Sequence, residues 1–135
     1  MSVITAFLFP GQGAQEIGMA SDVVVASAAA KAIFDEADDV LGISLGKIIL
    51  EGPAEELVRS HNAQPAILTA SIALLRGLEE RMGDSMPVPT FVAGHSLGEY
   101  TALVATGSLD FAQALRLVRR RGELMQAAAQ ATPSG

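Results

Sequence analysis

The sequence predicts an α/β fold in which a parallel β-sheet is covered by helices on both faces, a three-layer α/β/α arrangement. Two short apolar runs, residues 3–8 (VITAFL) and 89–93 (PTFVA), have the composition of buried strands, and a glycine-containing loop follows each. Helix-forming stretches fill most of the chain between and after them. An order of strand, helices, strand, helix, helix is typical of parallel sheets. Because two strands make a small sheet, we expect the chain to be part of a larger domain.

The first half of the chain is expected to hold one strand and several helices. Residues 3–8 are apolar and partly β-branched, which predicts a strand buried on both faces. Apolar residues at helical spacing predict a helix over 22–41, which ends before a glycine. Residues 44–60 indicate one or two short helices, with Pro53 suited to a first helical turn. A long helix is predicted over 64–82.

The second half is expected to hold the second strand and two further helices. Residues 89–93 run directly into a glycine-flanked turn, and a helix continues from there to about Thr106. Asp110 is suited to cap the last helix, because Gln113 stands three residues on and completes a capping box. That helix is predicted to run to about Ala129.

Composition excludes several classes of protein. The chain has 135 residues, of which 50% are hydrophobic, so one domain with an ample core is expected. A net charge of −6 argues against a nucleic-acid partner. The absence of cysteine excludes a disulfide framework, a thiol nucleophile and a cysteine-based zinc site. No apolar stretch approaches the roughly 20 residues of a membrane span, so no membrane partner is expected.

Residues 94–98 (GHSLG) match the G-x-S-x-G pattern, in which a sharp strand-to-helix turn exposes a nucleophilic serine. The amides at the start of the following helix would favour negative charge on a bound carbonyl oxygen. The alternative is a glycine-rich turn with an incidental serine. Adjacent residues on a sharp turn point in different directions, so His95 is expected to pack beside Ser96. His61 is expected to be exposed at a helix end, so neither histidine is a good candidate for the general base.

Residues 11–15 (GQGAQ) follow the first strand, at the edge of a parallel sheet where ligands bind. The backbone N–H of this loop could complete an oxyanion hole with that of Leu97. A tight turn with two exposed glutamines is the alternative interpretation. The loop has neither the third glycine of a dinucleotide-binding loop nor the lysine of a phosphate-binding loop.

One arginine in the last helix differs from its neighbours. An apolar stripe is expected to face the core and consists of Phe111, Ala114, Leu115, Val118, Gly122 and Met125. Arg116, Arg119 and Arg120 lie on the opposite, solvated side, whereas Arg121 borders the stripe. Its planar guanidinium suits a carboxylate held by two parallel hydrogen bonds. That carboxylate could belong to a ligand or to an acidic residue of the protein in an internal salt bridge.

Four segments in order, FPGQG-x-Q, AQPAILTAS, GHSLGEY and LVRRRGELMQ, resemble the malonyl-CoA:acyl-carrier-protein transacylase family. The resemblance covers the whole chain. It implies an acyltransferase core similar to the α/β-hydrolases, with residues 1–135 as the N-terminal part of the large subdomain. The family's ferredoxin-like small subdomain and its catalytic histidine lie downstream and are absent from these residues. Little or no turnover is therefore expected of residues 1–135 alone.

The resemblance also implies a role for individual residues. Ser96 matches the acylated nucleophile, and the backbone amides of Gln12 and Leu97 match the oxyanion hole. Arg121 matches the residue that binds the free carboxylate of the malonyl group. Two further residues, Gln64 and His95, match residues near the active site.

The implied reaction moves malonyl from malonyl-CoA to the phosphopantetheine thiol of acyl carrier protein through an acyl-serine, in fatty-acid biosynthesis. Coenzyme A enters as a thioester substrate, and no metal or redox cofactor is implied. A cytoplasmic enzyme that is monomeric at full length is expected. Because the carrier protein is expected to be acidic, the arginines 116, 119 and 120 are a candidate docking patch.

Three alternatives remain open from the sequence. A serine hydrolase, such as an esterase or a patatin-like lipase, would share the GHSLG turn but would not need Arg121. A related acyltransferase, from a polyketide synthase or from malonate decarboxylase, would share all four segments. A non-catalytic remnant could bind acyl carrier protein or another chain.

Overall fold

The computed structural model describes residues 3–132, and its sheet consists of two parallel strands. Strand β1 (Ala6–Phe9) pairs with β2 (Phe91–Gly94), and the register aligns Ala6 with Phe91 and Phe9 with Gly94. Both strands therefore end at the same edge of the sheet, where the loop after β1 and the turn after β2 begin. The predicted mixed α/β class and the parallel pairing are confirmed.

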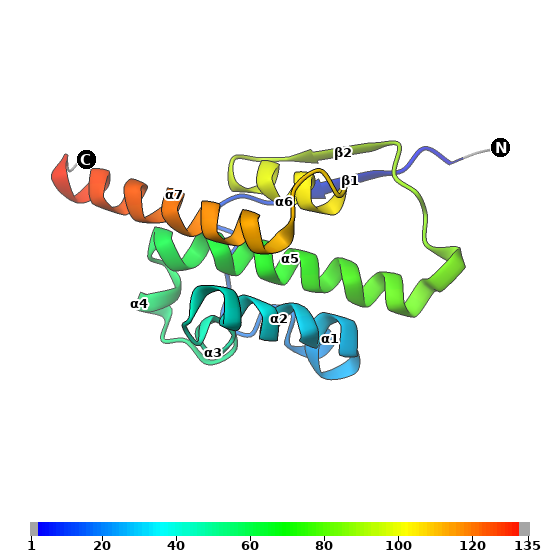
Figure 1. Ribbon diagram of the computed structural model, residues 1–135, viewed down its shortest axis with the longest axis horizontal. Coiled ribbons are helices and arrows are strands. Elements are labelled where there is room, and N and C mark those ends of the chain that lie inside the picture. Colours follow the sequence, from blue (N-terminus) through cyan, green and yellow to red (C-terminus); the bar gives the residue numbers. More distant parts are fainter. Residues whose placement is uncertain (1–2, 133–135) are drawn as a thin grey trace.

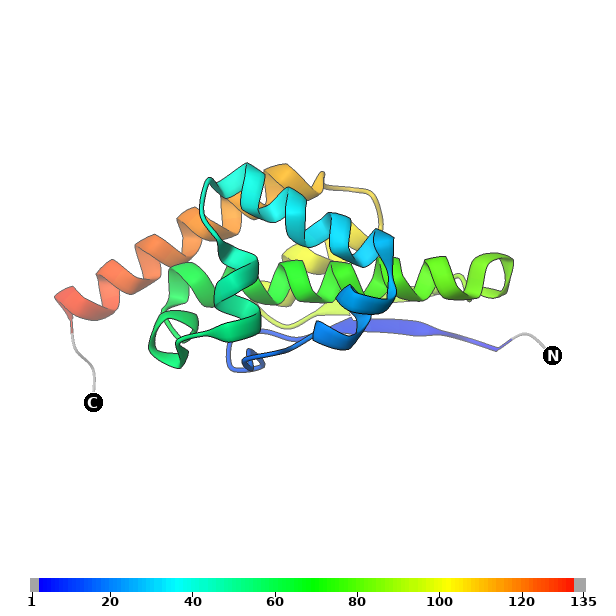
Figure 2. The same ribbon diagram turned by 90° about the horizontal axis from the view of Figure 1, so that it is seen from below.

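The helices lie on one side of this sheet and form two layers (Figures 1 and 2). Their bounds are α1 (Ser21–Ala26), α2 (Ala28–Leu41), α3 (Leu45–Glu51), α4 (Ala54–Leu57), α5 (Ser60–Met82), the 3₁₀ turn η1 (Gly83–Ser85), α6 (Leu97–Ala105) and α7 (Phe111–Ala131). Helix α5 runs through the middle, with α6 and α7 on one flank and α1 to α3 on the other. None of the helices among residues 3–132 is both long and apolar enough to cross a membrane.

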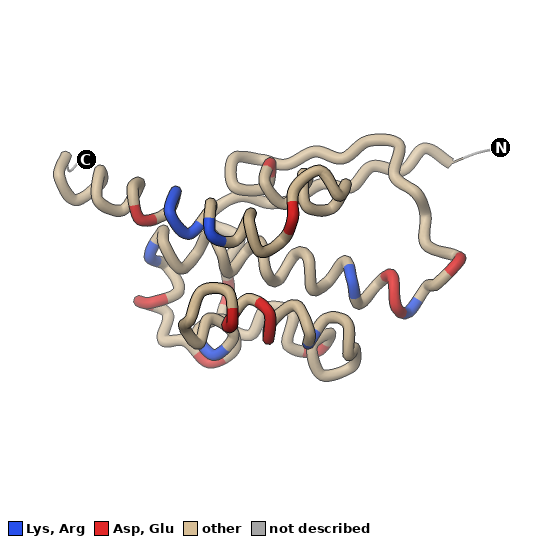
Figure 3. Tube along the Cα trace, in the orientation of Figure 1, with Lys and Arg blue, Asp and Glu red and all other residues tan. Residues whose placement is uncertain are grey.

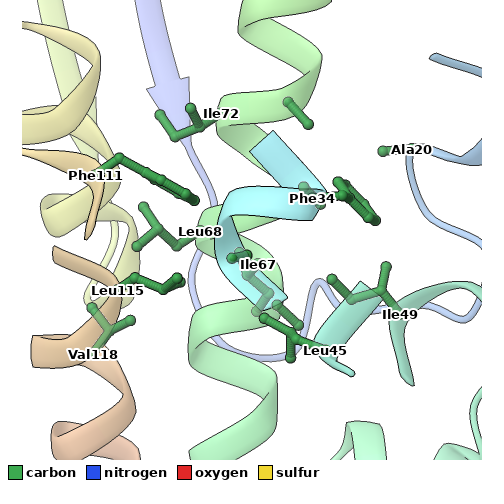
Figure 4. Packing of buried hydrophobic residues seen from close by; sticks show 14 of the residues in the cluster. Ala20, Phe34, Leu45, Ile49, Ile67, Leu68, Ile72, Phe111, Leu115 and Val118 are labelled. Atoms are coloured by element: carbon green, nitrogen blue, oxygen red, sulfur yellow. The ribbon is translucent and has the colours of Figure 1, made fainter. Parts of the chain in front are cut away.

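The core is built around α5, which carries the largest share of the fully buried side chains (Figure 4). Apolar residues of α2, α3 and α7 pack against it from both flanks. The large members of the cluster are Phe34, Leu45, Ile49, Ile67, Leu68, Ile72, Phe111, Leu115 and Val118. This cluster fixes α7 beside the first half of α5, and that contact builds the site described below.

The prediction that the first strand is buried on both faces is wrong. Side chains alternate along both strands, so that one face is half-buried against the helices and the other is exposed. Leu8 is 76% exposed and Phe91 is 63% exposed. The reason is that the described residues provide helices to only one face of the sheet (Figure 1). The free edge of β1 also opens into an apolar groove beside Leu74 and Leu78 of α5.

Two helix boundaries differ from the prediction for identifiable reasons. The helix predicted over 22–41 is two helices, because Ser27 between them is extended, with φ −131° and ψ 120°. Its Oγ accepts from the N–H of Ala30 and donates to Oε2 of Glu80 at 2.6 Å, so it caps α2. Helix α5 begins at Ser60, before the predicted start at 64, and includes Pro65.

Candidate active site

Ser96 occupies a strained turn between β2 and α6. Its φ of 53° and ψ of −107° lie in a region that residues other than glycine rarely adopt. The turn is held to the first strand, because the N–H of His95 donates to the carbonyl oxygen of Phe9 at 3.1 Å. The N–H of Gly98 donates to the carbonyl of His95 at 2.8 Å, which starts the helix. Ser96 therefore projects from a turn that its neighbours hold in place.

Both glycines of the GHSLG turn are required by close backbone contacts. A Cβ at Gly94 would lie 2.0 Å from the carbonyl carbon of Gly98, and one at Gly98 would lie 2.2 Å from the carbonyl oxygen of Phe9. Neither distance is compatible with a side chain, and backbone atoms cannot swing aside as a side chain does. The spacing of the two glycines therefore reflects how tightly β1, β2 and α6 meet at Ser96.

The guanidinium of Arg121, on α7, reaches Ser96 from the neighbouring helix. Its Nη2 donates to Oγ of Ser96 at 3.0 Å, and its Nη1 donates to Oε1 of Gln64 at 2.7 Å. Its Cζ lies 5.5 Å from the ring centroid of Tyr100. Within residues 3–132 no carboxylate forms an ion pair with this arginine, so the alternative of an internal salt bridge is wrong there. A half-buried cation thus faces the candidate nucleophile without an anionic partner from the described chain.

Gln64 joins this arginine to the loop after β1. Its side chain is fully buried, and its Nε2 lies 3.4 Å from Oε1 of Gln12 and 3.1 Å from Sδ of Met125. The Nε2 of Gln12 in turn donates to Oγ of Ser60 at 3.0 Å. A continuous polar network therefore links the loop 11–15, the start of α5, α7 and Ser96. Met125 was expected in the core, but it is 42% exposed, because the C-terminal part of α7 extends beyond α5 (Figure 1).

Two backbone amides at the site have no acceptor among the described residues. These are the N–H of Gln12, in the loop after β1, and the N–H of Leu97, the first residue of α6. Both follow strands that are parallel neighbours, so both lie at the same edge of the sheet. Free N–H groups at a helix start favour an anion or a developing oxyanion.

Within residues 3–132, neither histidine forms a hydrogen bond with the serine oxygen. The only hydrogen bond of Ser96 Oγ within residues 3–132 is the one from Arg121. The Nδ1 of His95 would lie 2.8 Å from a Cβ at Gly11, so this ring packs over the loop after β1. His61 is half-buried, whereas an exposed side chain was expected. Its burial, and then the positive charges of Arg119 and Arg59, lower the pKa of its imidazole. No three His, Asp or Glu side chains in the described part of the chain are grouped closely enough to hold a metal ion.

The prediction that Arg119 lies on the solvated side of α7 is wrong. Its Nη1 donates to the carbonyl oxygen of His61 at 2.8 Å and to Oδ1 of Asn62 at 2.6 Å. Proline has no N–H, so Pro65 leaves the carbonyl of His61, four residues earlier, without its helical donor. Arg119 supplies that donor from the neighbouring helix. The proline inside the helical segment was the signal in the sequence that could have indicated this contact.

The basic residues of α7 lie close together along one stretch of the helix (Figure 3). Arg116 and Arg120 are exposed, and Arg120 pairs with Glu123 at 3.2 Å. The candidate docking patch is therefore reduced from three arginines to two, one of which already has an acidic partner.

Known proteins match the chain over nearly its whole length. Residues 6–134 match the family model described as the acyl transferase domain. A malonyl CoA-acyl carrier protein transacylase of Bacillus subtilis (strain 168) is 54% identical over 130 residues, which are 96% of this chain and 39% of the relative. The protein of the same name from Escherichia coli (strain K12) is 47% identical over 130 residues, which are 96% of this chain and 40% of the relative.

Solved structures agree with these matches. An acyl carrier protein S-malonyltransferase from Vibrio cholerae O1 biovar eltor has a TM-score of 0.88 and 45% identity, over 98% of this chain and 42% of that one. A malonyl-transacylase in complex with its type II polyketide carrier protein has a TM-score of 0.87 and 45% identity, and the match covers 98% of this chain and 41% of that one. The chain thus spans about two fifths of the length of the relatives it matches. The fold, the site and these matches together show that the chain belongs to the acyl transferase domain family.

Proposed function

We propose that this chain provides the nucleophile and the carboxylate-binding site of an enzyme that transfers malonyl from malonyl-CoA to acyl carrier protein in fatty-acid biosynthesis. The observation that carries the proposal is the position of Arg121. Its guanidinium lies 3.0 Å from Ser96 Oγ and has no carboxylate partner among residues 3–132. The names of the relatives support this reaction, and the solved complex with a carrier protein supports a carrier as the acceptor.

The free carboxylate of a malonyl group provides the partner that Arg121 lacks. Two N–H groups of the guanidinium already bond to Ser96 and Gln64, and the others remain to hold the carboxylate. The malonyl group has its carboxylate and its thioester carbonyl on the same carbon, so an arginine that holds the carboxylate beside Ser96 also places the carbonyl there. An esterase has no use for a cation at this position, which favours the transferase over the hydrolase.

The reaction proceeds in two half-reactions. Ser96 Oγ attacks the thioester carbon and loses its proton to a base. The amides of Gln12 and Leu97 hold the oxyanion. The bond to the coenzyme A sulfur then breaks as the base returns the proton to that sulfur, so that the thiol leaves, the base is free again and malonyl-Ser96 remains. The phosphopantetheine thiol of the carrier protein then attacks the ester carbonyl. Its proton returns to Ser96 Oγ through the base, and malonyl leaves on the carrier.

The base is expected from outside the described residues. Neither histidine forms a hydrogen bond with Ser96 Oγ among residues 3–132, and the family resemblance implies a histidine downstream. We infer that the GHSLG turn is a nucleophile elbow and that residues 1–135 belong to the large subdomain, with the ferredoxin-like small subdomain beyond them. The complete enzyme is inferred to be a cytoplasmic monomer without a metal or redox cofactor.

A transfer assay tests the proposal. The protein to use is a chimaera in which residues 1–135 are followed by the part of the Bacillus subtilis relative that comes after the matched region. With malonyl-CoA and holo acyl carrier protein, the chimaera should produce malonyl-carrier protein, and its Ser96→Ala form should not. Rapid release of free malonate without carrier product would support the hydrolase. A folded chimaera that consumes no malonyl-CoA would contradict the proposal.

A further inference from the structure

Arg121 is held by three different elements, and one contact is made by a residue that the proposed reaction does not use. Gln64 on α5 and Ser96 in the turn each bond to one Nη atom. The third contact is the ring of Tyr100 on α6, whose centroid lies 5.5 Å from Cζ. That distance is within the roughly 6 Å over which an aromatic face attracts a cation.

The position of Tyr100 suits this task. It stands four residues after Ser96, one turn along the helix that begins at the serine. Its ring is half-buried and packs against the hydrophobic core, so its orientation is fixed by the fold. The same helix therefore carries the oxyanion amide of Leu97, the serine at its start and the ring that contacts the arginine.

An arginine at this position needs such a contact to stay in place. Its neighbour Arg120 is 67% exposed, so solvent lies close to this part of α7. A long cationic side chain without an anionic partner tends to extend into water, where its head is hydrated and its rotamers are free. Gln64 and Ser96 offer two neutral acceptors, and the ring adds attraction to the face of the guanidinium.

We propose that Tyr100 is a positioning residue that determines acyl specificity, because its ring keeps the guanidinium of Arg121 beside Ser96 and ready for a free carboxylate. This inference rests on the proposed function. It goes further by assigning the preference for acyl groups with a free carboxylate to a pair of residues, one of which does not bind the substrate.

The phenol hydroxyl has no part in this role. Within residues 3–132 it makes no hydrogen bond, and only the aromatic face meets the arginine. Tyr100→Phe is therefore a matched control that keeps the ring. Tyr100→Leu fills a similar space with an apolar side chain but removes the aromatic face.

The test measures the loading of malonyl and acetyl groups from their coenzyme A thioesters onto the chimaera and its two Tyr100 variants. Tyr100→Leu should raise KM for malonyl-CoA roughly 3- to 10-fold, the range expected for a partly desolvated cation–π contact, with little change in kcat. Acetyl loading should not change, since acetyl has no carboxylate. In Tyr100→Leu the preference for malonyl over acetyl should fall by the same factor, whereas Tyr100→Phe should keep the preference of the parent.

Other outcomes separate the possible errors. If Tyr100→Leu lowers malonyl and acetyl loading equally, the residue is only structural and the inference fails. The inference also fails if the preference is unchanged in Tyr100→Leu while Arg121→Ala abolishes it, although the proposed function then stands. A folded parent chimaera that loads neither group contradicts the proposed function, and the role of Tyr100 fails with it.

Discussion

The contact between Arg119 and the carbonyl that Pro65 leaves free predicts a specific coupling between these two residues. Changing Arg119 to Met keeps the apolar stem and removes the guanidinium. The carbonyl oxygen of His61 then loses the donor that lies at 2.8 Å, and Oδ1 of Asn62 loses the one at 2.6 Å. Hydrogen bonds from a charged donor contribute about 1.5–3 kcal/mol each, and the arginine is 24% exposed, which reduces that contribution. We expect Arg119→Met to lower the free energy of unfolding by about 2–3 kcal/mol.

In a Pro65→Ala background the same change should cost less. Alanine restores an N–H four residues after His61, so the carbonyl keeps a donor when the guanidinium is lost. The bond to Asn62 is lost in both backgrounds and cancels from the comparison. The coupling free energy between the two changes should therefore be about 1 kcal/mol.

Urea unfolding of residues 1–135, at one protein concentration low enough that the chain does not self-associate, measures this cycle when followed by far-ultraviolet circular dichroism. Arg116→Met is the matched control, because Arg116 is exposed on the same helix, and it should change stability by less than about 0.5 kcal/mol. Additive effects of Arg119→Met and Pro65→Ala, within about 0.3 kcal/mol, would refute the argument that the arginine replaces the donor missing at the proline.

Three further predictions follow from the packing of the described residues. Gly98→Ala should destabilise the protein by about 3 kcal/mol, because the new Cβ would lie 2.2 Å from the carbonyl oxygen of Phe9. Gly46→Ala is the control and should be neutral or stabilising, since the atom nearest to its Cβ would lie 3.4 Å away. Equal unfolding midpoints for the two variants would contradict this prediction. Hydrogen bonds from Ser27 Oγ and the N–H of Ala29 lower the pKa of Glu80 below its usual 4.5. The stabilisation from this carboxylate is therefore present above pH 4.5 and is lost as pH falls through the lowered pKa. The difference in free energy of unfolding between the parent and Glu80→Gln should shrink as the pH is lowered, and a difference that does not change with pH would contradict this. The exposed apolar face and free edge of the sheet should make residues 1–135 self-associate, and light scattering that shows a monomer at every concentration would contradict this.

Local patterns predicted the elements that depend on nearby residues. The N-cap at Asp110 is confirmed, because its carboxylate accepts from the N–H of Gln113 at 3.1 Å. The turn at Ser96 follows from two glycines in the sequence. Arg121 was distinguished from its neighbours by helical spacing alone, and the structure places it at the serine.

Features that depend on distant residues were not predicted from local patterns. The break at Ser27 is stabilised by Glu80, which is 53 residues away. The contact of Arg119 depends on a proline in another helix. Burial of the strands was overestimated because apolar composition indicates what a strand can pack against, and these residues provide helices on one side only. Tyr100 was missed, since no pattern in the sequence relates its ring to an arginine in the next helix.

The central claim is that Arg121 selects acyl groups that carry a free carboxylate for transfer to Ser96. Its most direct test is the intact mass of the chimaera after brief exposure to equal amounts of malonyl-CoA and acetyl-CoA. The parent should carry malonyl, the Ser96→Ala form should carry neither group, and the Arg121→Ala form should carry acetyl in place of malonyl. An Arg121→Ala form that still takes malonyl in preference to acetyl would contradict the account.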